Sequence, residues 1–174
     1  MDKITTCVFD AYGTLFDVNA ACRELSKEVG DKWNELSSLW RLRQVEYTWL
    51  RNSMKEYIDF WKITSDALDY AMETLNIKNS KLRNELLSLY LKLEAYPEVK
   101  PVLENIKNMG LKTAILSNGN KIALEMGIQL SEYDKERKWE ISYTYKKNIR
   151  NTQTGLLIFY RKNHFIINQN FFKF

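Results

Sequence analysis

The 174-residue sequence contains little proline, glycine, cysteine or histidine, with 2 Pro, 6 Gly, 2 Cys and 1 His. So few Gly and Pro residues exclude a collagen-like or low-complexity chain. Cys7 and Cys22 form neither a disulfide framework nor the ligand spacing of a metal site, and His164 alone excludes a His-rich site. No apolar run approaches the roughly 18–20 residues that cross a bilayer, and the N-terminal segment MDKITTCVFD lacks the apolar stretch of a signal peptide. We therefore expect a soluble, cytoplasmic protein with no membrane partner.

The formal net charge of +4 is distributed unevenly along the chain. Residues 1–120 carry 16 Lys and Arg against 17 Asp and Glu, whereas residues 121–174 carry 10 against 5. The basic residues of this second segment follow no regular stripe, so we do not expect a nucleic-acid partner. Lys, Asn, Ile, Phe and Tyr also make up 28 of residues 121–174 but only 36 of residues 1–120. The chain thus consists of two unlike segments that meet near residue 120.

The apolar pattern predicts two short strands separated by helices. The strands are expected at 3–9, as a buried strand, and at 112–116. Helical periodicity lies between them, with Asp31 and Ser80 as candidate N-caps and Gly110 as a C-terminal stop. The predicted helical segments are 18–30, 31–54, 55–75 (one helix, or a pair broken near 64–65), 80–93 and 99–109. A helix-rich insertion of roughly 80 residues between parallel strands indicates an α/β core with a helical cap.

Both predicted strands end in polar loops, and ligands of open α/β sheets bind at the carboxyl ends of strands. Asp10 follows the first strand and is suited to be a nucleophile, a base or a metal ligand, or a simple turn cap. Gly13 lets the backbone curl so that its N–H groups face the carboxylate, and Thr14 follows it. Ser117 and Asn118 end the second strand, where they could bind an anion or form a polar turn. The two loops are therefore candidates for one site.

Arg41 lies in an apolar-rich helical segment, LWRLRQ at 39–44. Its guanidinium offers a two-pronged donor for a carboxylate or another anion. The alternative is an exposed helix arginine with no role in a site.

Three stretches together resemble the type II 2-haloacid dehalogenases of the haloacid dehalogenase superfamily. They are FDAYGTLFDV at 9–18, LWRLRQVEYTWLRNSM at 39–54 followed by Tyr57 and Phe60, and GLKTAILSNGN at 110–120. The resemblance implies a Rossmann-like parallel-sheet core, incomplete here, with an inserted helical-bundle cap. It divides the chain into a partial core (1–16 and 97–120), a cap (17–96) and a divergent tail (121–174).

The resemblance also implies a reaction and a role for each site residue. Asp10 would attack C2 of an (S)-2-haloacid, expel halide with inversion and form an ester, and water would then release an (R)-2-hydroxy acid. Burial of the site would strip water from the nucleophile. Thr14 would position Asp10, and Ser117 would hold the substrate carboxylate. Arg41 and Asn118 would receive the halide. The alkyl group of the small 2-haloalkanoic acid would be surrounded by Tyr12, Val45 and Phe60.

Tyr12 distinguishes this reaction from phosphate hydrolysis. Phosphatases of the superfamily carry a second Asp at this position to protonate the leaving group, and a departing halide needs no proton. The motif therefore argues for a reaction without bound magnesium or another cofactor. The alternatives that stay open are a phosphatase-like hydrolase and an inactive remnant with a binding role. The resemblance further implies a homodimer formed through the cap.

The resemblance stops at about residue 120. Family members continue with a Lys-Pro element, a Ser-Ser-Asn loop and a further Asp, and the sequence has no Pro after Pro101. Ser131, Ser142 and Asp134 lie outside any such motif. We favour a truncation or frameshift near 120–127, which would leave a poorly ordered tail, an unpaired edge on the second strand and a slower attack by Asp10. The alternative is a genuine divergent C-terminus with replacement strands at 140–145 and 155–160.

Overall fold

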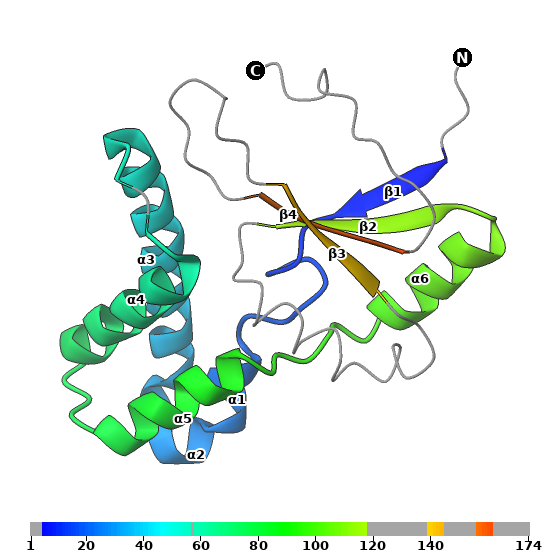
Figure 1. Ribbon diagram of the computed structural model, residues 1–174. Helices are drawn as coiled ribbons and strands as arrows, with labels where there is room; N and C mark the ends of the chain where they lie inside the picture. Colours follow the sequence, from blue (N-terminus) through cyan, green and yellow to red (C-terminus); the bar gives the residue numbers. More distant parts are fainter. Residues whose placement is uncertain (1–4, 57, 118–138, 145–155, 162–174) are drawn as a thin grey trace.

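The computed structural model describes residues 5–56, 58–117, 139–144 and 156–161, the last two ranges by their backbone. A strand opens the described chain, a series of helices follows, and three further strands come after them (Figure 1). The elements are β1 (Thr6–Phe9), α1 (Ala20–Glu24), α2 (Ser26–Val29), the 3₁₀ helix η1 (Gly30–Lys32), α3 (Trp33–Met54), α4 (Phe60–Thr74), α5 (Ser80–Tyr90), α6 (Val99–Asn108), β2 (Lys112–Ser117), β3 (Trp139–Thr144) and β4 (Leu156–Arg161).

The four strands form one mixed sheet in the order β1-β2-β4-β3. β1 and β2 are parallel, with Thr6 opposite Lys112 and Phe9 opposite Ile115, and this parallel pair connected through helices confirms the α/β class. β4 pairs antiparallel with β2, and β3 pairs antiparallel with β4. The expectation of an unpaired edge on the second strand is therefore wrong, because β4 occupies that edge. The residue ranges of β3 and β4 nearly coincide with the replacement strands, 140–145 and 155–160, that the alternative interpretation of the tail predicted.

The helices α1 to α5 form a unit beside the sheet, whereas α6 lies near β2 at the far side (Figure 1). The chain passes between sheet and helical unit twice, at residues 15–17 and 94–96. These two segments are hydrogen-bonded to each other, because Tyr96 N–H donates to the Leu15 carbonyl at 3.0 Å and Asp17 N–H to the Glu94 carbonyl at 2.9 Å. The carboxyl ends of β1 and β2 point toward the helical unit. The loop that carries Asp10, and Ser117 at the end of β2, consequently lie where the sheet meets the helices.

The buried hydrophobic cluster lies mainly within the helical unit and reaches the loop after β1 and Ile115 of β2. Apolar side chains recur on the inward faces of its helices, as the 3.6-residue period requires. Closely packed side chains of this kind supply about 1.5–3 kcal/mol each when fully buried. The fully or nearly fully buried members include Ala11, Cys22, Leu36, Trp40, Ala67, Leu68, Ala71, Leu82 and Leu86.

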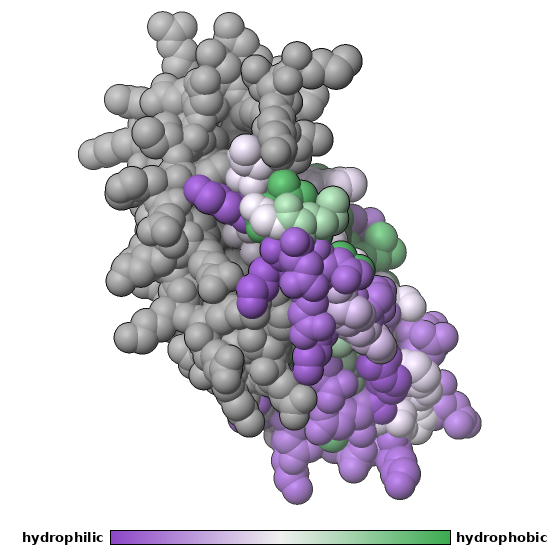
Figure 2. All heavy atoms as spheres, turned by 90° about the vertical axis from the view of Figure 1, so that its right-hand side faces the viewer, coloured by the Kyte–Doolittle hydropathy of each residue, from purple (hydrophilic) through white to green (hydrophobic). Residues whose placement is uncertain are grey.

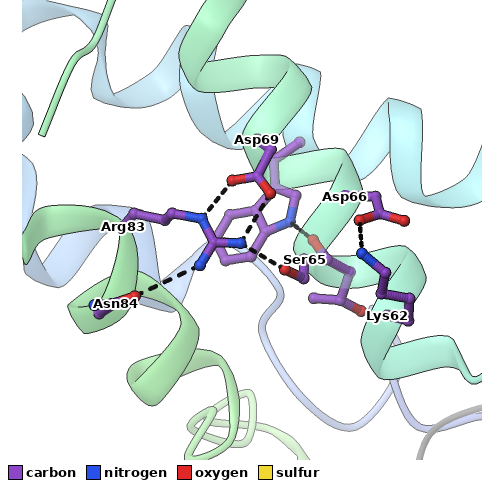
Figure 3. A network of polar contacts seen from close by, with 8 residues as sticks. Lys62, Ser65, Asp66, Asp69, Arg83 and Asn84 are labelled. Atoms are coloured by element: carbon purple, nitrogen blue, oxygen red, sulfur yellow. Dashed lines mark hydrogen bonds and ion pairs between the residues drawn. The ribbon is translucent and has the colours of Figure 1, made fainter. Parts of the chain in front are cut away.

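Arg83 ties α5 to α4 (Figure 3). Its Nε and Nη2 both donate to the carboxylate of Asp69, with an Nη2–Oδ2 distance of 2.8 Å. Nη2 also donates to Ser65 Oγ at 2.7 Å. Lys62 and Asp66 form a second ion pair on α4, at 2.6 Å. A two-pronged arginine–carboxylate contact fixes the geometry of two helices better than a single ion pair does.

The segment 55–75 contains one helix, the first of the two alternatives, and this helix begins at Phe60 after the left-handed backbone of Lys55, whose φ is 61°. Two predicted N-caps are wrong. The N-cap of α5 is Asn79, which accepts from Leu82 N–H at 3.0 Å, rather than the neighbouring Ser80. Asp31 lies inside the 3₁₀ turn that precedes α3 and caps no helix. Gly110, with a φ of 74°, follows α6 as predicted.

The sheet is less covered than a buried strand requires. Val8 is 50% exposed in the middle of β1, so the prediction of a buried first strand is wrong. The molecular face turned toward the viewer in Figure 2 is largely hydrophilic among its coloured residues, with a small hydrophobic group near its centre. Within the described ranges no helix combines the length and the apolar character needed to span a membrane.

Candidate active site

The loop that follows β1 is a tight turn built on the Ala11 carbonyl. The backbone N–H groups of Leu15 and Phe16 donate to this oxygen at 2.8 and 2.9 Å. Gly13 adopts a φ of 88°, which side chains with a Cβ rarely tolerate. The turn returns Thr14 toward the strand end, where its hydroxyl donates to Asp10 Oδ2 at 3.4 Å. The sequence prediction that Thr14 lies beside Asp10 thus agrees with the geometry.

Ser117 ends the neighbouring strand on the same side of the sheet as Asp10. Phe9 and Ile115 are opposite each other in the parallel register, so Asp10 lies one residue beyond Phe9 and Ser117 lies two residues beyond Ile115. Ser117 is buried, at 3% exposure. Asn118, the other predicted residue of this loop, lies outside the described residues. The register accordingly brings the carboxylate of one loop and the hydroxyl of the next to one edge.

Arg41 reaches the Asp10 loop from the helical unit. Its Nη2 donates to the Tyr12 carbonyl oxygen at 3.0 Å. A Cβ added to Gly13 would lie 3.7 Å from this same nitrogen, so the guanidinium packs over the glycine. The side chain is partly buried, which strengthens its field relative to that of a solvated arginine. This contact places a permanent cation next to the turn that carries Asp10.

Aromatic side chains surround Tyr12, which is buried at 7% exposure. Tyr90 stacks on it with ring centroids 5.8 Å apart and an interplanar angle of 8°, and Phe60 packs at 5.7 Å and 42°. Desolvation by burial, with smaller contributions from Tyr90 and Asp10, raises the pKa of Tyr12 above its ordinary value, despite the opposing effect of Arg41. A phenol with a raised pKa is a weaker acid than a free tyrosine, and the ring contacts of Tyr12 fit an apolar wall of the site.

Sequence reasoning missed three polar residues behind Arg41. Gln44 Oε1 accepts from Arg41 Nη1 at 2.7 Å and from the Tyr90 hydroxyl at 3.1 Å, and Gln44 Nε2 donates to Thr64 Oγ1 at 2.7 Å. Gln44, Thr64 and Tyr90 are exposed by 1%, 0% and 4%. The available signal was a glutamine in phase with Leu36 and Trp40 on the buried face of α3. Such a buried amide requires partners, and that requirement could have identified the network.

Some of the predicted site residues contact one another in the structure, and others do not. Asp10, Thr14, Tyr12, Arg41 and Phe60 are linked by the contacts above. Val45 lies on α3 next to Gln44 and is partly buried. The predicted burial of the nucleophile is wrong for this structure, because Asp10 and Thr14 are both exposed. The described part of the chain contains no group of three or more His, Cys, Asp or Glu side chains arranged to hold a metal ion.

Comparison with known proteins assigns this arrangement to a family. The model of a haloacid dehalogenase-like hydrolase matches residues 4–147. The chain belongs to the haloacid dehalogenase-like hydrolase family. The family match continues to residue 147, beyond the range 120–127 in which the sequence predicted a truncation or frameshift.

Several proteins similar to this chain are named as 2-haloacid dehalogenases. (S)-2-haloacid dehalogenase 4A of Burkholderia cepacia is 44% identical over 78% of this chain and 59% of its own. (S)-2-haloacid dehalogenase 1 of Pseudomonas sp. (strain CBS-3) is 50% identical over 69% of this chain and 53% of its own length. The structure of L-2-haloacid dehalogenase from Xanthobacter autotrophicus with chloropropionic acid covalently bound has a TM-score of 0.68 and 33% identity, over 76% of this chain and 54% of that one. The chain thus spans just over half the length of these relatives.

Proposed function

We propose that this chain performs hydrolytic dehalogenation of (S)-2-haloacids through an ester on Asp10. The observation that carries the proposal is the contact between Arg41 Nη2 and the Tyr12 carbonyl. It brings a cation from the helical unit to the turn that bears the predicted nucleophile. A cation at this place attracts an anionic substrate and stabilises a departing halide, as a preorganised charge does at a developing anion.

The reaction divides into two steps with balanced bonds. A carboxylate oxygen of Asp10 attacks C2 of the haloacid from the side opposite the halogen. The C–O bond forms as the carbon–halogen bond breaks, and halide leaves with the bonding electrons. Water then adds to the ester carbonyl of Asp10, the acyl C–O bond breaks, and an (R)-2-hydroxy acid and a free carboxylate result. No proton is needed by the leaving halide, which agrees with Tyr12 in place of an acid.

Each predicted residue has a role in this mechanism, and that of Asn118 rests on the resemblance alone. Thr14 orients the Asp10 carboxylate through their 3.4 Å contact, and Ser117 together with loop N–H groups binds the substrate carboxylate. Arg41 and Asn118 receive the halide. Tyr12, Phe60 and Val45 border the alkyl group. Asp10 is exposed, so water screens its charge more than in a closed site, and we expect a slow reaction.

The proposed division of the chain follows the two crossings between sheet and helices. Residues 1–16 and 97–120 form the partial core, 17–96 form the cap, and 121–174 form the divergent tail. The hydrogen-bonded segments 15–17 and 94–96 support these boundaries, because the chain leaves and re-enters the sheet region there. The Asp10 loop belongs to the core and Arg41 to the cap.

Halide release tests the proposed function. Three proteins are assayed with (S)-2-chloropropionate as the substrate. They are this chain, its Asp10→Asn form, and a chimera that continues from the matched region with the C-terminal residues of dehalogenase 4A. We expect slow release by this chain, none by Asp10→Asn and faster release by the chimera. A chimera that folds and releases no halide contradicts the proposal. Magnesium-dependent release of phosphate from a test ester would instead favour the phosphatase-like alternative.

We also propose a cytoplasmic location, which accords with the two free cysteines.

We propose a homodimer through the cap as well. Leu42, Trp49 and Leu50 of α3 are exposed by 51%, 69% and 57%. Apolar side chains that gather on one helix are typical of a surface that a partner covers. Light scattering of this chain and of Trp49→Lys tests the dimer, since a monomeric mass for the unaltered chain would contradict it.

A further inference from the structure

We propose that Gln44 is a positioning residue that aims the Arg41 guanidinium at the Asp10 loop, and that Thr64 and Tyr90 set the orientation of its amide. The inference rests on the proposed function for its catalytic meaning. Its structural basis is a chain of hydrogen bonds that begins at a backbone carbonyl of α4 and ends at Arg41. No motif in the sequence identified these three residues.

The Phe60 carbonyl determines the direction of the whole chain of hydrogen bonds. It can only accept, and the Thr64 hydroxyl donates to it at 2.8 Å. The Thr64 oxygen therefore has a lone pair rather than a proton for its second partner. Gln44 must point its NH₂ group at this oxygen, where Nε2 lies at 2.7 Å. Its carbonyl oxygen is then the end that faces Arg41, at 2.7 Å from Nη1.

Tyr90 supports the same orientation from a third helix. Its hydroxyl donates to Gln44 Oε1 at 3.1 Å, and a hydroxyl proton has a partner there only when the amide oxygen faces it. Burial raises the pKa of Tyr90 above its ordinary value, so the donor proton is retained. The ring of Tyr90 also stacks on Tyr12 at 5.8 Å. Tyr90 thus contacts both the Gln44 amide and the residue whose carbonyl accepts from Arg41.

Both terminal nitrogens of the Arg41 guanidinium are hydrogen-bonded. Nη1 donates to Gln44 and Nη2 to the Tyr12 carbonyl at 3.0 Å. Two fixed donors remove the rotation that a solvated guanidinium retains, and a reacting group misplaced by about 1 Å can lose on the order of a hundredfold in rate. The side chain is thereby ordered before substrate arrives.

The choice of an amide rather than a carboxylate has an electrostatic consequence. Among the described residues, Arg41 donates to the Gln44 amide oxygen and to a backbone carbonyl and also interacts with the Tyr90 hydroxyl, all of them neutral, and no ion pair to Arg41 occurs there. The guanidinium keeps its full charge for an anion. A glutamate at 44 would accept from the same nitrogen but would neutralise the cation. Gln44 therefore positions Arg41 without cancelling its attraction for halide or carboxylate.

Thr64→Val is the direct test, because valine keeps the shape of threonine and removes the hydroxyl. Thr64→Ser restores the hydroxyl and loses a methyl group. Thr74→Val is the matched control, since Thr74 also lies on α4 and donates to a carbonyl four residues earlier, that of Tyr70, at an exposed position. Each variant is made in the full 174-residue chain, and its folding is checked by thermal unfolding.

The readout is the ¹⁵N spectrum of the Arg41 guanidinium, assigned with Arg41→Lys, together with halide release from (S)-2-chloropropionate. We expect Thr64→Val to speed rotation of the guanidinium and to lower kcat roughly tenfold, while KM changes less. Thr64→Ser should resemble the unaltered chain, as should Thr74→Val. A purely structural role would move the unfolding midpoint and leave the guanidinium signals and the kcat of the folded protein unchanged.

The outcomes separate this inference from the proposed function. An Arg41 spectrum that is identical in Thr64→Val and the unaltered chain overturns the positioning role, whatever the activity. A spectrum that changes as expected supports that role, even when no protein of the series releases halide and the dehalogenation proposal fails. Gln44→Glu provides a second check. It should keep the guanidinium ordered and still lower halide release, and an unchanged release would overturn the electrostatic part of the inference.

Discussion

Arg41 and Tyr12 join the two parts of this protein at the candidate site, through a 3.0 Å hydrogen bond from the Arg41 guanidinium to the Tyr12 carbonyl. The arginine comes from the long helix α3, and the carbonyl belongs to the turn that follows the first strand. The relative position of cap and core therefore determines whether the cation lies near Asp10. Changes to this contact should affect catalysis more than stability.

Replacement of Arg41 by lysine should lower halide release by at least roughly tenfold, because an ammonium group lacks the planar fork that reaches Gln44 and Tyr12 together. The control is Arg43→Lys on the same helix. Arg43 pairs with Glu46 and lies over the Tyr70 ring, away from the Asp10 loop. Steady-state kinetics of both variants gives the comparison. Equal activities for the two would remove Arg41 from the mechanism.

Thr14→Val should slow ester formation, because the hydroxyl that contacts Asp10 Oδ2 at 3.4 Å is lost. The effect is expected to be roughly tenfold or less, since the contact is long and exposed and a hydrogen bond to a charged group is worth about 1.5–3 kcal/mol at most. Thr14→Ser keeps the hydroxyl and should retain most of the rate. The rate of halide release in a single turnover measures this step. Equal rates in the valine and serine variants would contradict the role given to Thr14.

Loss of the Arg83 contacts should destabilise the helical unit by about 1 kcal/mol. Arg83 donates to Asp69 and Ser65 across α4 and α5, and partly exposed ion pairs of this kind contribute up to about that amount. Arg83→Met preserves the aliphatic part of the side chain. Urea unfolding measures the change, with Lys81→Met as the control, because Lys81 pairs with Glu85 within α5 at 3.8 Å. A smaller loss for Arg83→Met than for Lys81→Met would show that the α4–α5 contact contributes little.

Stability should fall at alkaline pH because Cys22 is buried. Desolvation raises the pKa of its thiol from 9.0 to about 11, so the unfolded chain releases this proton at lower pH than the folded chain. The folded state then binds more protons between these values, and the free energy of unfolding decreases as pH rises through them, by roughly 2–3 kcal/mol in total. Below pH 9 the contribution is fully present. Urea unfolding between pH 8 and 11 should show a shallower decline for Cys22→Ala than for Cys7→Ala, and parallel declines would contradict the assignment.

Local sequence pattern predicted the parts of the fold that local physics determines. The apolar segment before Asp10, the helical period around Arg41 and the segment 112–116 led to the parallel pair and to the helices between its strands. Gly110 ended its helix because its positive φ suits glycine. Asn79 and Ser80 are both good N-caps, and the choice between neighbours depends on how α5 packs rather than on propensity.

Long-range contacts account for what the sequence did not reveal. The pairing of β4 with β2 joins residues about forty positions apart, and no periodicity encodes such a partner. The exposure of Asp10 likewise depends on which elements cover the loop. Gln44, Thr64 and Tyr90 come from three helices, so their network exists only after those helices pack, although a glutamine on a buried helix face already indicates that partners are needed.

A covalent ester on Asp10 is the most direct test of the central claim. The chain is mixed with (S)-2-chloropropionate, quenched in acid and digested, and the peptide that contains Asp10 is analysed by mass spectrometry. The account predicts a substrate-derived ester on Asp10 of the unaltered chain that appears together with the released halide, and no ester in Asp10→Asn. Halide release by the unaltered chain with Asp10 unmodified throughout, or undiminished release by Asp10→Asn, would contradict it.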